Sequence, residues 1–212
     1  MSKQLLLLLF ICFSPILKAQ NATEIELETI ETAAQIESYL ETKKSKKNKL
    51  ITFNEEKHKT QLAKALFKMH VGSTKVNENE FEKTLYKVVS KTKKIYYRVS
   101  CIYLDGTKYS LEKIINLRDI IIKKYKNGAS FNFLAKQYSM DHNANKGGDL
   151  GWFLKESIHP EFGEKVIGIE HEINDIFTID IPSKNWYYVV LKTYEPKEIS
   201  EIEVLKIVEP IK

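Results

Sequence analysis

The chain has 212 residues, of which 43% are hydrophobic, 29% are charged and 11% are aromatic. This composition can supply a hydrophobic core, so it excludes wholesale disorder, and the length suits one moderate domain or one domain with a small second module. The formal net charge of +5 is spread over neighbouring Lys and Glu residues, which favours a solvated surface over a nucleic-acid-binding stripe.

Residues 1–19 are typical of a secretory signal peptide, with Lys3 in a basic start, an apolar core at Leu5–Phe13 and the small residue Ala19 before the cleavage point. The apolar run is shorter than the about 20 residues of a membrane-spanning helix, so we expect no stable membrane insertion after cleavage. Removing Lys3 and Lys18 leaves 31 basic and 28 acidic residues, a formal charge of +3. The pattern predicts a periplasmic or secreted protein.

Cleavage would leave a single cysteine, Cys101, in the mature chain. One cysteine cannot form an internal disulfide. An exported protein of this kind must therefore be stabilised by its core alone.

Residues 20–94 are predicted to form a mainly helical N-terminal module. Apolar residues at helical spacing indicate helices at Thr23–Lys44 and Glu55–His70, whereas Ser73–Lys94 fits either a helix or a strand. The lysine-rich Lys43–Lys49 is typical of a solvated segment, with membrane or nucleic-acid contact as the less favoured alternative. This module carries no catalytic motif. Its candidate roles are packing against the next domain, dimerisation or holding unfolded chains.

A different pattern begins near residue 95. Alternating β-branched and aromatic residues predict a strand at Lys94–Leu104, with Cys101 and Tyr103 on one face. Ser110 and Ser130 are candidate N-caps of two following helices. The remaining expected elements are a short strand at Leu150–Phe153, a helix at Pro160–Val166, strands at Asp175–Asp180 and Trp186–Tyr194, and a charged tail at 196–212 with an optional last strand at Ile202–Val208.

The most distinctive stretch is Tyr138–Phe153, YSMDHNANKGGDLGWF. Its adjacent glycines, Gly147 and Gly148, allow positive φ and close backbone approach, which suits a tight junction after a helix. Taken alone, the glycines fit an ordinary surface turn equally well. The complete stretch, together with the blocks RVSCIYL, GASFNFLAKQYS, HPEFGEKV and YYVVLKT in this order, resembles the parvulin (rotamase) family of peptidyl-prolyl cis/trans isomerases.

The resemblance covers roughly Tyr97–Thr193 and implies an α+β fold: a parvulin-like small antiparallel sheet flanked by helices, at residues 95–195, preceded by the mainly helical module. It also implies a slot for a proline ring, lined by Leu150, Ile158 and Phe162. The resemblance places Trp152 near this slot and assigns Ser183 to substrate binding as well. Without it, ordinary core packing is the better explanation of the apolar residues.

Asp141 falls where the family places a Cys or an Asp beside the rotating carbonyl; the alternative is a loop carboxylate that caps the next short turn. Most family members carry two histidines, on the first and the last strand, and this chain has Cys101 and Tyr188 there. A thiol is a weak hydrogen-bonding group and a phenol both donates and accepts, so the polar network must differ. His142 and His171 lie outside the motif positions and do not read as replacements.

The leading hypothesis is an exported isomerase that accelerates X-Pro rotation in unfolded or nascent exported polypeptides and needs no cofactor or metal. The replaced histidines keep open a non-catalytic parvulin-like chaperone, and a structural envelope protein that reuses the fold is a third option. No nucleic-acid partner is expected. The short acidic loop Asp105–Tyr109 argues against a preference for phosphorylated substrates.

Overall fold

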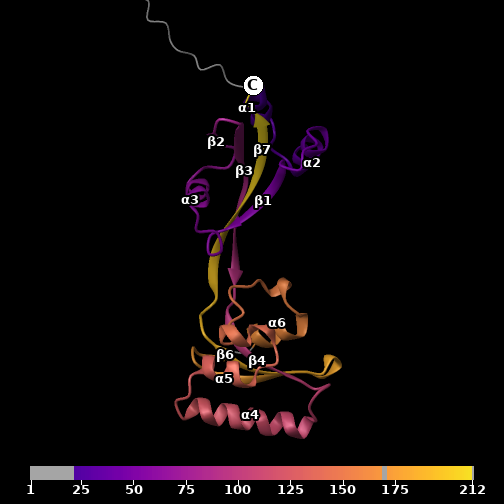
Figure 1. The fold of residues 1–212 in the computed structure, drawn as a ribbon, viewed down its shortest axis with the longest axis vertical. Helices are drawn as coiled ribbons and strands as arrows, with labels where there is room; N and C mark the ends of the chain where they lie inside the picture. The colour runs from indigo at the N-terminus through magenta and orange to yellow at the C-terminus, as the bar shows by residue number, and fades with distance from the viewer. Residues whose placement is uncertain (1–21, 169–170, 212) are drawn as a thin grey trace, which may run out of the picture. The chain divides into compact units, whose positions relative to one another are not determined.

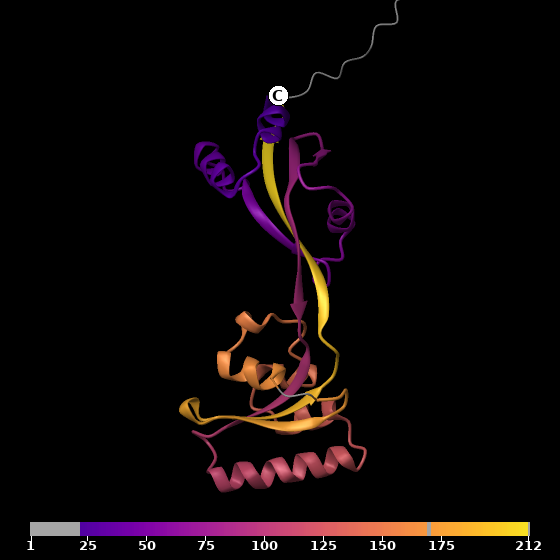
Figure 2. The same cartoon turned by 180° about the vertical axis from the view of Figure 1, so that it is seen from behind.

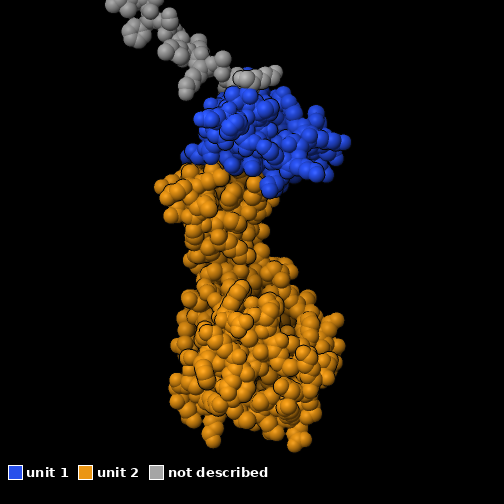
Figure 3. Space-filling model, viewed as in Figure 1, with its two compact units in different colours: residues 1–50, 70–89, 205–212 blue, residues 51–69, 90–204 orange. Residues whose placement is uncertain are grey.

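The computed structural model describes residues 22–168 and 171–211, so the predicted signal peptide at residues 1–19 lies outside the described part. The chain divides into two compact units (Figure 3). Unit 1 draws on residues 1–50, 70–89 and 205–212, and unit 2 on residues 51–69 and 90–204. Neither unit is a continuous stretch of sequence. The boundaries expected from the sequence, at 94/95 and 195/196, therefore remain predictions.

Four strands form a sheet with the order β1-β7-β3-β2, so the last strand of the chain lies between the first and the third (Figure 1). Strands β2 and β3 pair antiparallel, with Val76 opposite Leu85. The bounds of these strands are β1 Lys49–Asn54, β2 Thr74–Glu78, β3 Glu82–Tyr96 and β7 Lys197–Pro210. The expectation of a mainly helical N-terminal module is therefore wrong. Residues 73–94, which fitted either pattern, are mostly strand, because β2 and β3 are joined by only three residues, 79–81.

The single helix expected at Thr23–Lys44 is two helices, α1 (Ala22–Glu28) and α2 (Ala33–Thr42). Thr32 is the N-cap of α2. Its hydroxyl accepts from Gln35 N–H, and the Gln35 side chain accepts from Thr32 N–H in a capping box. The capping preference of this Thr–Gln pair thus interrupts the continuous apolar periodicity on which the prediction rested.

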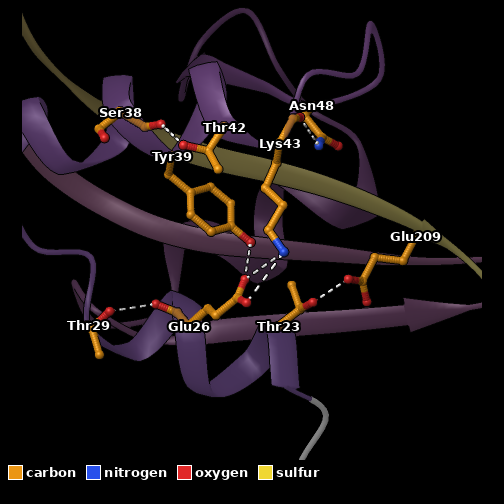
Figure 4. Close-up of polar contacts among 9 residues, drawn as sticks. All are labelled: Thr23, Glu26, Thr29, Ser38, Tyr39, Thr42, Lys43, Asn48 and Glu209. Atoms are coloured by element: carbon orange, nitrogen blue, oxygen red, sulfur yellow. Dashed lines mark hydrogen bonds and ion pairs between the residues drawn. The ribbon is translucent and has the colours of Figure 1, made fainter.

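Polar side chains tie the two helices of unit 1 together (Figure 4). Tyr39 of α2 and Lys43, the C-cap of this helix, both point to Glu26 of α1, with the Tyr39 hydroxyl 3.2 Å and the Lys43 ammonium 3.0 Å from its carboxylate. The Thr23 hydroxyl donates to Glu209 of β7. Burial and the Glu26 charge together raise the pKa of Tyr39, so the phenol stays protonated as a donor.

The core of unit 1 combines residues that are far apart in sequence. The buried members come from α1, the turn after it, α2, β3 and β7: Leu27, Ile30, Ile36, Leu85, Leu205 and Ile207. Residues 196–212 are consequently no charged tail. The charged residues of β7 alternate with buried apolar ones, and the optional last strand is longer than expected.

Unit 2 contains a three-stranded antiparallel sheet with the order β4-β6-β5. Figures 1 and 2 show α4 and α6 on opposite sides of this sheet, with α5 on the α4 side. The bounds are β4 Val99–Asp105, β5 Ile176–Ile181, β6 Trp186–Lys192, α3 Gln61–Phe67, α4 Leu111–Lys126, α5 Phe131–Tyr138 and α6 Pro160–Ile167. The α+β class and the parvulin-like sheet flanked by helices are confirmed.

Local signals place most elements of unit 2. Ser110 and Ser130 accept the N–H groups of Lys113 and Phe133, each over 3.3 Å, and so cap α4 and α5 as expected. The expected helix at Glu55–His70 is shorter, because a turn precedes its Thr60 N-cap.

Two expected strands of this region differ in the structure. The strand expected at Lys94–Leu104 is interrupted between β3 and β4, where Tyr97 instead bridges to Phe153. That bridge, with a second between Ser100 and Asp149, takes the place of the short strand expected at Leu150–Phe153. Among residues 22–168 and 171–211, the helices lack the length and apolar character that crossing a bilayer requires.

Candidate active site

The loop Ser139–Asp149, which carries Asp141, is hydrogen-bonded to β4 at Tyr103. Met140 N–H donates to the Tyr103 carbonyl over 2.9 Å, and Tyr103 N–H donates to Ser139 Oγ over 3.0 Å. These bonds fix the beginning of the loop on the strand. Asp141 therefore emerges beside the Tyr103 end of the three-stranded sheet.

The Asp141 carboxylate is half-buried and contacts two neighbouring residues, Asn143 and His142. It accepts from Asn143 N–H at 3.4 Å and caps the short 3₁₀ helix η1 (His142–Lys146), which is the alternative role that the sequence left open. The exposed His142 places Nδ1 2.5 Å from Asp141 Oδ1, so the two form an ion pair whenever the imidazole is protonated. Asn143 contacts both carboxylate oxygens, because its side-chain amide also donates to Oδ2 over 3.4 Å.

The paired glycines let the end of this loop lie directly on β4. Gly148 has φ of +77°, and its carbonyl accepts Cys101 N–H over 2.9 Å. A Cβ at Gly148 would meet the Cys101 carbonyl, so only glycine allows this approach. Gly147, with φ of +74°, ends η1. The motif thus fixes the loop by a backbone contact beneath the site.

Cys101 and Tyr188, which the sequence resemblance matches to two family histidines, lie on the neighbouring strands β4 and β6. The register pairs Tyr103 with Tyr188 and Cys101 with Val190. The Tyr188 ring is 5.3 Å from the Tyr103 ring and 4.9 Å from the Phe162 ring of α6, both measured between centroids. The structure therefore groups the two replaced positions with an aromatic pair.

Electrostatics keep the polar groups of this cluster protonated. Burial, followed by the charge of Asp141, raises the pKa of the Cys101 thiol to about 12. The pKa of Tyr188 is also raised, chiefly by burial and then by Cys101, Tyr103 and Asp141. Burial raises the pKa of Tyr103 as well. Near neutral pH the cluster presents one carboxylate with neutral hydroxyl and thiol groups around it.

Three of the predicted slot residues come together on the α6 side of the sheet. Leu150, Ile158 and Phe162 belong to one cluster with Cys101 and Tyr188. Phe162 is 5% exposed, whereas Leu150 and Ile158 are half-buried and border the surface. The cluster is thus partly ordinary core, as its composition alone suggested, and partly an apolar surface.

Trp152 and Ser183 do not join this cluster. The Trp152 ring lies beside Tyr194, at 5.5 Å between centroids, and beside the cationic groups of Arg98 and Lys197, at 5.9 and 5.8 Å. Ser183 is exposed in the 3₁₀ turn η3 (Pro182–Lys184). Its assignment to substrate binding remains a prediction.

An ion pair holds the end of the loop at Asp149. Arg98 donates to both oxygens of Asp149, with Nε 3.0 Å from Oδ1 and Nη2 2.5 Å from Oδ2. Asp149 also accepts Gly151 N–H over 2.9 Å. The bonds from Arg98 hold the pKa of Asp149 below its ordinary value, although burial opposes this. This bidentate pair connects the start of β4 to the residue after the paired glycines.

Within the described ranges, no three His, Cys, Asp or Glu side chains come together as metal ligands would.

Tyr103 is the residue of the site that sequence reasoning did not select. Alternation along the strand had placed it on the face of Cys101, but no motif marked it. His142, which the sequence did not select as a replacement for a family histidine, is exposed and contacts Asp141.

A model of the PPIC-type peptidyl-prolyl cis/trans isomerase (PPIase) domain matches residues 83–193, just over half of the chain. This chain therefore belongs to the PPIC-type PPIase domain family. The match contains the loop, the sheet and the apolar cluster described above.

Two curated relatives are foldase protein PrsA of Bacillus subtilis, 40% identical over 75 residues, and chaperone SurA of Aromatoleum aromaticum, 38% identical over 73 residues. Each alignment covers 34% of this chain, but only 24% of PrsA and 15% of SurA. The crystal structure of Bacillus subtilis PrsA aligns with a TM-score of 0.38 and 30% identity, over 47% of this chain and 35% of that one. This chain thus spans a minor part of these relatives.

Proposed function

We propose that this protein is an exported peptidyl-prolyl isomerase that accelerates X-Pro rotation in unfolded client polypeptides. Export rests on the signal-peptide pattern of residues 1–19. Activity rests on membership of the PPIase family and on one observation in particular: the loop that carries Asp141 is hydrogen-bonded to β4 at Tyr103, and the neighbouring Cys101 and Tyr188 share a cluster with Leu150, Ile158 and Phe162.

The chemistry needs no nucleophile. An X-Pro bond resists rotation because the nitrogen lone pair is delocalised into the carbonyl, with a barrier of about 18–20 kcal/mol. An apolar surface that holds the proline ring removes water from the amide, and water favours the more polar planar form. A carboxylate beside the carbonyl oxygen disfavours the same form electrostatically. Both effects favour the twisted amide over the planar one, which is the requirement for catalysis.

The neutral hydroxyls of Tyr103 and Tyr188 take the orienting role that imidazoles have elsewhere in the family. Because both pKa values are raised, neither group competes with Asp141 as an anion near neutral pH. Rotation should therefore proceed with little dependence on pH between about 7 and 9.

The experiment is the cis-to-trans rate of short X-Pro peptides with the purified protein, with X varied. Asp141→Ala and Phe162→Ala should each lower kcat/KM by about tenfold or more. Matched controls are Asp119→Ala and Phe133→Ala, on the exposed faces of α4 and α5, which should keep wild-type rates. Failure of the wild type to accelerate any peptide, with the protein folded, would refute the enzyme hypothesis.

A non-catalytic chaperone is the second candidate. The Cys101 thiol is 2% exposed within an apolar cluster, so it is a poor substitute for a hydrogen-bonding imidazole. The names foldase and chaperone among the relatives are compatible with client binding without catalysis. A chaperone should suppress aggregation of proline-free clients, whereas an isomerase should accelerate only refolding that is limited by proline.

A further inference from the structure

A pocket of about 480 Å³ lies beside the apolar cluster, in unit 2. Tyr96 and Phe153, at 3% and 6% exposure, are its most deeply buried lining residues. The full set of lining residues is Lys57, Tyr96, Leu150, Trp152, Phe153, Leu154, Ser157, Ile158 and Glu201. Lys57 and Glu201 lie outside the segment that matches the family model. The surroundings of the candidate site thus include residues that the family domain alone does not supply.

The acidic residue of this lining is fully engaged. Glu201 receives the Lys94 ammonium at 2.8 Å, the Asn54 amide at 3.3 Å and the Tyr96 hydroxyl, and its side chain is 12% exposed. A carboxylate held in this way has little capacity to bind a further cation. Its negative charge is offset within the wall of the pocket.

The basic residue of the lining is free. Lys57 is exposed, and within the described ranges its ammonium has no ion-pair or hydrogen-bond partner. The neighbouring lysines differ, because Lys59 and Lys197 both pair with Glu56. Just beyond the lining, the exposed Lys155 and Glu156 are adjacent and of opposite charge. Lys57 therefore contributes an unpaired positive charge to the lining of the pocket.

The pocket shares two walls with the proposed proline slot. Leu150 and Ile158 line the pocket and also belong to the cluster that contains Phe162. In an extended peptide, side chains two positions apart point the same way and lie about 6.5 Å from each other. A client with its proline on the Leu150–Ile158–Phe162 surface can therefore place a second side chain in the pocket.

We propose that this pocket is a client subsite that binds an apolar side chain near the proline and that Lys57 selects clients with a Glu or Asp next to that side chain. Lys57 is then a specificity-determining residue of the isomerase. The inference rests on the proposed function, because it takes the position of the proline from that proposal. An apolar interior with a cation at the rim is complementary to an apolar residue followed by an acid.

The test is fluorescence anisotropy of labelled X-Pro peptides that carry Leu-Glu or Leu-Lys within three residues of the proline, on either side. The wild type should bind the best Leu-Glu peptide about two- to fivefold more tightly than its Leu-Lys counterpart, as expected for one exposed charge pair. Lys57→Glu should reverse the preference. Lys64→Glu, at an exposed position of α3, is the matched control and should leave the preference unchanged.

Equal dissociation constants for the two peptides in the wild type, or the same preference in Lys57→Glu, would overturn the subsite. Raised salt should reduce the preference, because exposed charges are screened over about 8–10 Å. The anisotropy readout is independent of catalysis. Loss of isomerisation with the charge preference intact would overturn the proposed enzyme function alone, and isomerisation without the preference would overturn the subsite alone.

Discussion

Gly148→Ala should destabilise unit 2 by clearly more than Gly151→Ala, although both glycines have positive φ. Gly148 has φ of +77° and Gly151 has φ of +66°, so each alanine carries a left-handed backbone cost of about 1–2 kcal/mol. The surroundings differ: a Cβ at Gly151 meets nothing within 4 Å, whereas a Cβ at Gly148 meets the Cys101 carbonyl. The chain thus contains its own matched control.

The extra effect at Gly148 follows from its hydrogen bond. Moving the loop away to make room for a methyl group breaks the 2.9 Å bond from Cys101 N–H, and a buried unpaired N–H costs about 1–3 kcal/mol. We therefore expect a total loss of about 2–5 kcal/mol for Gly148→Ala against about 1–2 kcal/mol for Gly151→Ala.

Urea unfolding followed by tryptophan fluorescence is the suitable assay. Both tryptophans, Trp152 and Trp186, lie in unit 2, so the signal reports on the unit that contains the substitution. With a slope of about 2 kcal/mol per molar urea, the two variants should differ in midpoint by about 1 M. Equal midpoints would show that the close approach of Gly148 to β4 contributes nothing and that backbone strain explains both substitutions.

Two further predictions concern stability as a function of pH. Asp149→Asn should lower the free energy of unfolding by about 1 kcal/mol at pH 7, since the Arg98 contact is bidentate but partly exposed. The folded pKa of Asp149 is depressed, so this advantage exists above the ordinary value of 3.8 and disappears as the pH falls through the folded value; urea titrations of both proteins should converge in acid. Cys101→Val should remove a loss of stability that the wild type shows at alkaline pH. The pKa of the thiol rises from 9.0 to about 12 on folding. Between these values the free energy of unfolding of the wild type should therefore fall relative to the variant by up to about 1.4 kcal/mol per pH unit. Parallel stability curves for wild type and Cys101→Val in this range would contradict a buried neutral thiol.

The elements that the sequence predicted well are those with local signals. Ser110 and Ser130 cap α4 and α5 through side-chain oxygens that act within three residues, so no tertiary information is needed. Asp141, Cys101 and Tyr188 could be brought together because a sequence resemblance carries the three-dimensional neighbourhood with it. Their roles in catalysis remain predictions.

The predictions that failed concern segments whose structure depends on contacts with residues distant in the sequence. Residues 196–212 have many charges, so the sequence offered a last strand there only as an option. Strand β7 is buried on one side by residues of α1 and β3, and these contacts cannot be read from the local sequence. Trp152 contacts Arg98 and Tyr194 and lines the pocket beside Leu150 and Ile158, and its role in substrate binding remains a prediction. Tyr103 gave no motif signal at all.

The composition of unit 1 has a consequence for the order of folding. The Thr23 hydroxyl and the Glu209 carboxylate are hydrogen-bonded across 186 positions of sequence, and Leu205 completes the buried cluster that Leu27 begins. In a chain that is synthesised from its N-terminus, the apolar side of α1 stays exposed until β7 has been made. The PPIase sequence between them is available earlier and can fold from nearer contacts. We therefore expect unit 1, which contains α1, to complete its folding after unit 2.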